Sequence, residues 1–194
     1  MSKYVNAIAI LRGGKINKEC CSKTPAMLGA LDKLRDENKA CSTFIETFMC
    51  KDEEVIGTVR LQQELTGGPT TIKVNLSNLP YGPHGFHIHE FGDLTDGCTS
   101  AGAHYNPFNN HHGGQDDAER HVGDLGNIHS GVDGVIDATI TDYKISLVGP
   151  YSVIGRSFVV HADEDDLGKG GHEDSLTTGH SGARIACGII GLAK

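Results

Sequence analysis

The feature that most constrains the fold is a series of short segments in which apolar and polar residues alternate. A period of two is the pattern of a strand that buries one face. Glycine- and proline-rich stretches at residues 67–69 and 80–83 separate some of these segments and mark turns. The strand candidates are residues 4–11, 58–65, 70–76, 85–89, 117–124, 134–140 and 156–161. The sequence therefore predicts an all-β fold, a sandwich or a barrel, in a single domain spanning residues 1–194.

Residues 14–54 differ from the rest of the chain because they carry a helical pattern. Thr24 can cap a helix with Pro25 at its first position. Apolar residues then recur at helical spacing, at Met27, Leu28, Leu31 and Leu34. We therefore expect a helical insertion between the first two strands. It also holds four of the six cysteines, Cys20, Cys21, Cys41 and Cys50. We interpret these as free thiols because no C-x-x-C pair occurs, and a soft-metal site is the alternative.

The charge balance excludes several classes of partner. The formal net charge is -8, whereas nucleic acids and anionic membranes are bound through clustered Lys and Arg. No apolar run approaches the roughly 20 residues that span a bilayer, and the start of the chain lacks the features of a signal peptide. We therefore expect a cytoplasmic protein that acts on small solutes and has no nucleic-acid or membrane partner.

A run of potential metal ligands is the strongest indication of function. It comprises His87, His89, His104, His112, His121, Asp124 and His161. Side chains alternate along a strand, so His87 and His89 point to one face while Ile88 points to the other. Imidazole nitrogens suit copper and zinc, whereas magnesium and calcium prefer oxygen ligands. The set therefore predicts two transition-metal ions.

The ligands separate into two groups by their spacing. His121 and Asp124 supply a nitrogen and an oxygen donor three residues apart, and His112 lies in the preceding loop. Three histidines and one aspartate would fill all four positions of a structural zinc site. The residues left for a second, catalytic ion are His87, His89 and His161. His104 lies between the groups and could serve either.

Four motifs resemble the signatures of the copper/zinc superoxide dismutase family. They are GFHIHEFGD at residues 85–93, GCTSAG at 97–102, HVGDLGN at 121–127 and GARIACG at 182–188. The resemblance covers residues 3–12 and 55–194 and leaves the insertion unmatched. It implies copper and zinc as cofactors. It also implies an eight-stranded antiparallel Greek-key sandwich or flattened barrel with two long active-site loops, which would be residues 91–118 and 162–182.

The resemblance implies a role for each candidate site residue. The copper ligands would be His87, His89, His104 and His161, and the zinc ligands His104, His112, His121 and Asp124. His104 would bridge the two ions and, with Arg184, would be catalytic. Asp165 matches a carboxylate that hydrogen-bonds one copper-bound and one zinc-bound histidine, and Arg184 matches the arginine that docks superoxide. Cys98 and Cys187 match an intrasubunit disulfide.

The implied reaction is the dismutation of superoxide to oxygen and hydrogen peroxide by copper that cycles between Cu(II) and Cu(I). The resemblance also implies a homodimer, with contacts near residues 91–93, 154–155 and 188–192 that the insertion could perturb, and loading by a copper chaperone. Two lysines common in the family's outer channel are replaced by Asp163 and Thr177. This change predicts slower or less salt-dependent capture of the anionic substrate.

Two alternatives make different demands on the same residues. A zinc hydrolase needs an open coordination position, which four protein ligands would close. A copper chaperone or inactive metal-binding protein of the same fold tends to lack part of the copper set or the arginine, and here His161 and Arg184 are both present. The sequence therefore favours a dismutase.

Overall fold

The computed structural model describes residues 3–15 and 54–194, and these form an all-β fold. The predicted inserted helix and its four cysteines fall at residues 16–53, outside the described residues. The first strand continues to Lys15 and the second begins at Glu54, so both strands reach the junctions of the insertion. Among the described residues, no helix is long and apolar enough to cross a membrane.

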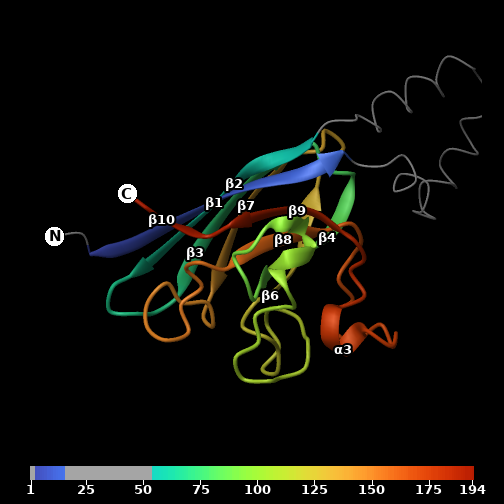
Figure 1. Ribbon diagram of the computed structural model, residues 1–194. Coiled ribbons are helices and arrows are strands. Elements are labelled where there is room, and N and C mark those ends of the chain that lie inside the picture. The colour runs from blue at the N-terminus through green and yellow to red at the C-terminus, as the bar shows by residue number, and fades with distance from the viewer. Residues whose placement is uncertain (1–2, 16–53) are drawn as a thin grey trace, which may run out of the picture.

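Strands of very different length make up the described chain. They are β1 (Tyr4–Lys15), β2 (Glu54–Glu64), β3 (Thr70–Ser77), β4 (Gly82–His89), β5 (Thr95–Cys98), β6 (Asp124–Ser130), β7 (Ile136–Asp142), β8 (Ser157–His161), β9 (Arg184–Ile189) and β10 (Gly191–Ala193). Two short helical turns, η2 (Thr99–Ala101) and α3 (Ser175–Thr178), lie between strands. Figure 1 shows the long strands β1 and β2 side by side, and α3 in the connection from β8 to β9.

Eight of these strands form a nearly closed antiparallel barrel. Their order across the sheet is β6-β4-β8-β9-β1-β2-β3-β7, and β10 pairs with β1. The strands at the two ends of this order, β6 and β7, also contact each other. β3 and β4 are consecutive in the chain but are not neighbours in the sheet, which is a crossover of the Greek-key type. The predicted eight-stranded antiparallel fold is therefore confirmed.

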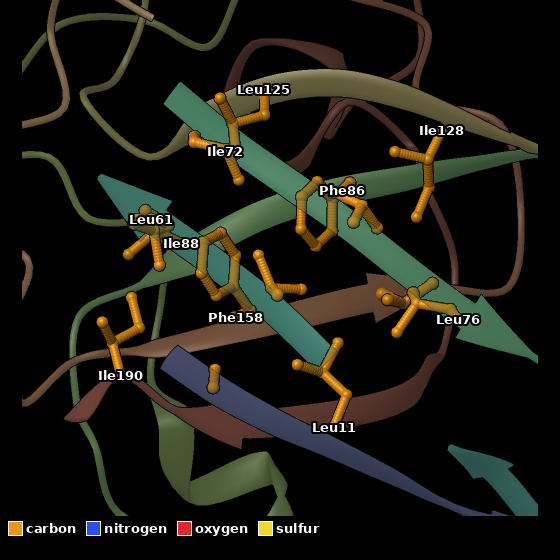
Figure 2. Packing of buried hydrophobic residues seen from close by; sticks show 14 of the residues in the cluster. Leu11, Leu61, Ile72, Leu76, Phe86, Ile88, Leu125, Ile128, Phe158 and Ile190 are labelled. Carbon is orange, nitrogen blue, oxygen red and sulfur yellow. The ribbon is translucent and has the colours of Figure 1, made fainter. Parts of the chain in front are cut away.

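The core lies inside the barrel and is built by the alternation that the sequence predicts. Ile72, Val74 and Leu76 of β3 are buried, and the residues between them face outward. Phe86 of β4 and Phe158 of β8 stack with ring centroids 5.0 Å apart. Figure 2 shows these two rings among aliphatic side chains from neighbouring strands. β4 therefore uses one face for core residues such as Phe86 and Ile88 and leaves the other face for His87 and His89.

The predicted strand at residues 117–124 is wrong, because β6 begins only at Asp124. Side-chain hydrogen bonds hold a turn at this point instead of a strand. The Asp124 carboxylate accepts a hydrogen bond from the His121 backbone N–H, with oxygen and nitrogen 2.9 Å apart. The buried Arg120 guanidinium donates to the carbonyl oxygens of Val122 and Asp124. The turn therefore presents His121 and Asp124 together.

Phe158→Ala should lower the free energy of unfolding by about 3–5 kcal/mol, because it removes a buried ring and the stacking partner of Phe86. Urea denaturation of the full chain, followed by circular dichroism, measures this loss. Ile10→Ala is a suitable control, because Ile10 is 59% exposed on β1; it should cost less than about 1 kcal/mol. An equal loss in both variants would contradict this description of the core.

Candidate metal centre

Antiparallel pairing brings the predicted metal ligands together on the outer face of the barrel. His87 and His89 are alternate residues of β4, and their side chains point away from the core residues Phe86 and Ile88. His161 ends β8, which pairs with β4 on one side. Asp124 begins β6, which pairs with β4 on the other side, and it is the register partner of His87. His104 lies in the loop after β4 and forms an isolated bridge with His89.

The donor atoms form two groups that share histidines. In the first group, donor atoms of four residues lie within 4.8 Å of one another: His87, His89, His104 and His161. In the second group, the residues are His87, His104, His112 and Asp124. The first group is the whole of the predicted copper set, and the second contains three of the four predicted zinc ligands. The fourth, His121, contacts the second group through its Nδ1, which lies 3.1 Å from Asp124 Oδ1.

Three buried histidines each have one ring nitrogen that makes no hydrogen bond. All seven predicted ligands are buried. Nδ1 of His87, Nε2 of His104 and Nδ1 of His112 make no hydrogen bond with other described residues, although Nδ1 of His112 lies 3.0 Å from Oδ2 of Asp124. An unpaired buried nitrogen costs free energy, and a metal ion would satisfy it. Imidazole and carboxylate donors suit copper and zinc, so the residues present fit both ions.

Backbone carbonyl groups orient the other two histidines of the first group. His89 Nδ1 lies 2.8 Å from the carbonyl oxygen of Gly102. His161 Nδ1 lies 3.2 Å from the carbonyl oxygen of Gly182. The two Nε2 atoms then face each other, 3.3 Å apart. Each ring therefore turns its Nε2 toward the centre of the group.

Asp124 is the carboxylate on which the second group converges. Its Oδ1 lies 2.9 Å from Nδ1 of His104 and 3.1 Å from Nδ1 of His121. Its Oδ2 lies 3.0 Å from Nδ1 of His112, at ion-pair distance, and accepts the backbone N–H of Gly113. Burial alone would raise the pKa of this carboxyl, but its contacts with the three histidines outweigh burial and hold the pKa well below the usual range. Asp124 is therefore ionised, as a metal ligand must be.

A second carboxylate, Asp165, links the two groups from outside. Its Oδ2 lies 2.8 Å from Nε2 of His87, and its Oδ1 lies 2.8 Å from Nε2 of His112. Burial would raise the pKa of Asp165, but hydrogen bonds from these two histidines lower it below its usual range. The Asn127 side chain bonds the Asp165 backbone twice, to its carbonyl oxygen and its N–H. Asn127 is not among the residues that the sequence predicts; its one signal is its place at the end of the HVGDLGN motif.

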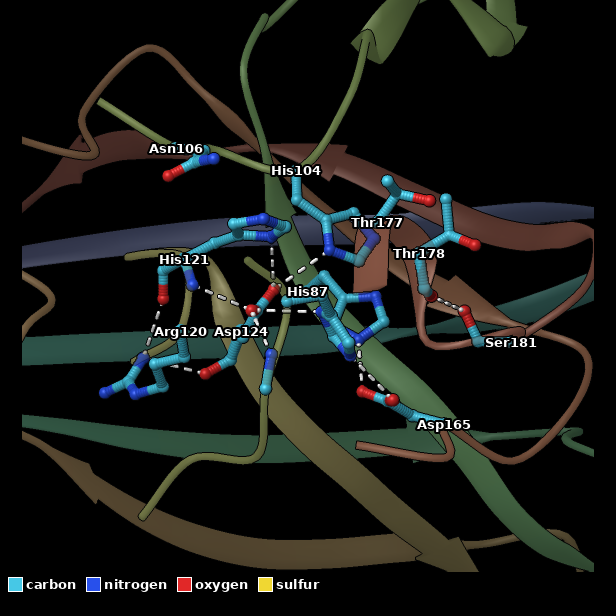
Figure 3. Close-up of polar contacts among 12 residues, drawn as sticks. His87, His104, Asn106, Arg120, His121, Asp124, Asp165, Thr177, Thr178 and Ser181 are labelled. Carbon is cyan, nitrogen blue, oxygen red and sulfur yellow. Dashed lines mark hydrogen bonds and ion pairs between the residues drawn. The ribbon is translucent and has the colours of Figure 1, made fainter. Parts of the chain in front are cut away.

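Arg120 and Asp142 form a buried ion pair under the turn that carries His121 and Asp124. Figure 3 shows Arg120 beside this turn, and Asp165 next to His87. Asp142 is itself anchored, because its Oδ1 accepts the backbone N–H groups of residues 144 and 145. The sequence does not predict this pair, since only the fold brings the end of β7 to the loop before β6. The pair fixes the turn to the barrel.

A family model described as copper/zinc superoxide dismutase matches residues 55–190 of this chain. The chain belongs to the copper/zinc superoxide dismutase family. Members of this family normally bind copper and zinc, and the two groups of donor atoms suit such ions. The matched range begins at residue 55 and does not include the first strand. The resemblance of residues 3–12 to the family therefore rests on their sequence and on the pairing of β1 with β2 and β9.

The predicted disulfide of this copper/zinc superoxide dismutase family member is confirmed. It joins Cys98 and Cys187, whose Cα atoms are 5.7 Å apart, and so ties the loop after β4 to β9. Arg184 Nη1 donates to the Cys98 carbonyl oxygen and Nη2 to that of Gly102, both at 2.7 Å. The Gly102 carbonyl oxygen is also the anchor of His89. One tethered loop therefore positions both Arg184 and a histidine of the first group.

Burial keeps the histidines of the first group neutral in this superoxide dismutase family member. Burial holds the pKa of His87 and His89 well below the ordinary value. Burial, followed by the electrostatic effect of His104, also lowers the pKa of His161 to about 4. Burial would also lower the pKa of His112, but its bonds with carboxylates outweigh burial and raise that pKa to about 9. Neutral imidazole is the form that binds metals, so the first group is ready to do so near pH 7.

Asp165→Asn should weaken zinc binding by about 10- to 100-fold, because His87 and His112 would lose the carboxylate that orients their rings. Competition between the zinc-loaded full chain and a chelator measures the dissociation constant. Glu164→Gln is the matched control, because Glu164 is the exposed neighbour of Asp165, and it should bind zinc as the unmodified chain does. Equal zinc affinity in all three proteins would rule out this role for Asp165.

Proposed function

We propose that this chain catalyses the dismutation of two superoxide anions to oxygen and hydrogen peroxide. The observation that carries the proposal is that the two groups of donor atoms share His87 and His104. Nε2 of His87 already lies 2.8 Å from Asp165 Oδ2, which leaves His104 as the histidine that could serve both ions. The proposed copper ligands are His87, His89, His104 and His161. The proposed zinc ligands are His104, His112, His121 and Asp124. Membership of the copper/zinc superoxide dismutase family supports this function.

His104 is the proposed proton donor. Copper supplies one-electron chemistry between Cu(II) and Cu(I) when it is bound, and zinc supplies a fixed positive charge. Nδ1 of His104 lies 2.9 Å from Asp124 Oδ1, so Nε2 is the ring atom that can take a proton and pass it to reduced superoxide. Burial lowers the pKa of His104, which makes the protonated ring a better acid. Its buried neighbours keep the ring in one orientation.

Arg184 is the proposed dock for superoxide. A guanidinium is always charged and offers several donors to a small anion. Bonds to the carbonyl oxygens of Cys98 and Gly102 fix its direction. Burial and the nearby His104 are the main causes of the lowered pKa of His161, and the positive charge of Arg184 lowers it further. The electric field of Arg184 therefore reaches the first group. An anion held by Arg184 would therefore lie beside the proposed copper ligands.

Metal analysis of the purified full chain, combined with a dismutation assay before and after copper loading, tests the proposed function. One copper and one zinc per chain with fast dismutation would support it. Zinc without copper, and no activity after loading, would overturn it in favour of a copper chaperone or an inactive metal-binding protein of the same fold. The complete first group and Arg184 favour the enzyme.

Arg184→Gln should lower kcat/KM for superoxide at least about 10-fold without loss of copper or zinc, because the substrate loses its fixed cation. The kcat/KM of Arg184→Lys should lie between that of Arg184→Gln and that of the unmodified chain, because lysine keeps the charge but not the planar set of donors. Pulse radiolysis measures these rates. Arg60→Gln, at an exposed position of β2, is the control for loss of one positive charge. A full rate in Arg184→Gln would contradict the role of Arg184.

Asp163 and Thr177 should make the capture of superoxide slower than lysines at these positions would. Asp163 is exposed just after β8, and Thr177 is exposed in α3. The double variant Asp163→Lys with Thr177→Lys should raise kcat/KM about 10-fold at low ionic strength and steepen its decrease with salt. Stopped-flow measurement over a salt series shows both effects. Asp137→Lys with Thr139→Lys, both exposed on β7, makes the same change in net charge. Equal gains in the two double variants would show that net charge alone matters.

We also propose a cytoplasmic homodimer that receives copper from a copper chaperone. Three large apolar side chains at the expected dimer contact are exposed, namely Phe91, Ile189 and Leu192. Burying such side chains between two copies would be favourable. Sedimentation of the full chain at micromolar concentration distinguishes the dimer from a monomer.

A further inference from the structure

A pocket of about 320 Å³ lies on the outer face of the barrel, where β10, β1, β2 and β3 follow one another. Figure 1 shows β1, β2 and β3 next to one another. The lining contains three cationic side chains and no acidic side chain; the cations are Arg60, Lys73 and Lys194. Neither Arg184 nor any proposed metal ligand lines the pocket. The pocket is therefore separate from the metal centre.

Two of the cations are direct neighbours across a strand pair. Arg60 of β2 is the register partner of Lys73 of β3, and both side chains are exposed on the same face of the sheet. Like charges at directly opposite positions destabilise a sheet. Within residues 3–15 and 54–194, neither side chain forms an ion pair or a side-chain hydrogen bond. An anion bound between Arg60 and Lys73 would therefore relieve their repulsion.

The acidic side chains that share this face of the sheet near the pocket have other partners. Glu64 lies further along β2 and pairs with Lys3, with nitrogen and oxygen 3.5 Å apart. Asp137 of β7 accepts a hydrogen bond from the Asn75 side chain at 2.8 Å. Among the described residues, no carboxylate side chain therefore neutralises the cations of the pocket.

Neutral polar groups form the adjacent row of the same pocket. Asn6 of β1, Gln62 of β2 and Thr71 of β3 are successive register partners. Gln62 Nε2 donates to Asn6 Oδ1 at 3.1 Å. Asn6 Nδ2 and the Thr71 hydroxyl have no acceptor among the described residues. Three cations with two neutral donors suit a ligand that carries several oxygen atoms and more than one negative charge.

We propose that this pocket binds small molecules that carry a diphosphate group. A guanidinium binds a phosphate through two parallel hydrogen bonds, and an ammonium binds it as a point charge. Arg60 and Lys73 hold one phosphate between β2 and β3, and Lys194 pairs with the second phosphate from the end of β10. The volume of about 320 Å³ lies at the lower end of the range for small-molecule sites.

The charge of the whole chain makes such binding local. The formal net charge is -8, so a polyanion is repelled by the molecule in general and retained only where cations gather. The proposal concerns this pocket alone and stands whether or not the chain is an active dismutase.

Lys73→Gln tests the pocket in the metal-loaded full chain, with inorganic diphosphate as the probe. Isothermal titration calorimetry at low ionic strength should show a dissociation constant at least about 10-fold higher in this variant. Urea denaturation should show that the free energy of unfolding is unchanged or higher, because Arg60 loses its like-charge neighbour. A folded variant with weaker binding separates a ligand contact from a structural role.

Two double variants separate the pocket from net charge. Arg60→Gln with Lys73→Gln should weaken binding of diphosphate more than Lys73→Gln alone. Arg12→Gln with Lys169→Gln makes the same change in net charge at exposed positions outside the pocket. This control should bind diphosphate within about twofold of the unmodified chain. Arg184→Gln should also leave the dissociation constant unchanged.

Three further probes define the ligand class. Inorganic monophosphate should bind at least about 10-fold more weakly than diphosphate, because it reaches fewer of the cations. Adenosine diphosphate and adenosine monophosphate should differ in the same direction. Tighter binding of adenosine diphosphate than of inorganic diphosphate would support organic diphosphates as the ligands, and equal binding would support the diphosphate group alone.

Four results would overturn the proposal. They are no binding of diphosphate by the unmodified chain, unchanged binding in Lys73→Gln, equal losses in the two double variants, and loss of binding in Arg184→Gln. The last result would place the anion at the proposed superoxide dock. Dismutation rates do not enter these comparisons, so failure of the proposed function and failure of this pocket remain distinguishable.

Discussion

The candidate metal centre depends on the buried carboxylate of Asp124. Histidines from three places in the chain contact its two oxygens: His104, His112 and His121. Asp124 is also the first residue of β6 and the register partner of His87 on β4. The barrel therefore fixes the position of one anion, and the loops arrange their rings around it. Arg120 holds the turn beneath this anion through its bonds to the backbone and to Asp142.

Two further constraints join the loops into one unit around that anion. Asp165 receives a hydrogen bond from one histidine of each side of the centre, His87 and His112. The carbonyl oxygen of Gly102 holds both His89 and Arg184, and the disulfide ties this loop to β9. A change at the disulfide would therefore reach the proposed substrate dock and a proposed copper ligand together.

Much of the fold and most of the site could be predicted from local patterns. Alternation in residues 70–76 identifies the core face of β3 because a strand exposes its two faces differently to water. The strand predicted at residues 117–124 does not form, because the backbone bonds with side chains instead of with a neighbouring strand. Arg120 donates to the Asp124 carbonyl oxygen, and the Asp124 carboxylate accepts the backbone N–H of His121. Asn127, Arg120 and Asp142 escape prediction because their partners lie elsewhere in the chain, and no local period marks such contacts.

The sequence by itself determined that the chain forms antiparallel strands and carries nitrogen donors suited to copper and zinc, because side-chain chemistry and a period of two are local properties. Only the tertiary structure decided which ring nitrogens lack a hydrogen bond and that His87 and His104 lie in both groups. It also brought together the two cysteines of the disulfide, which are 89 residues apart in the chain. Those arrangements follow from strand register and loop closure, which bring together groups that are distant in the chain.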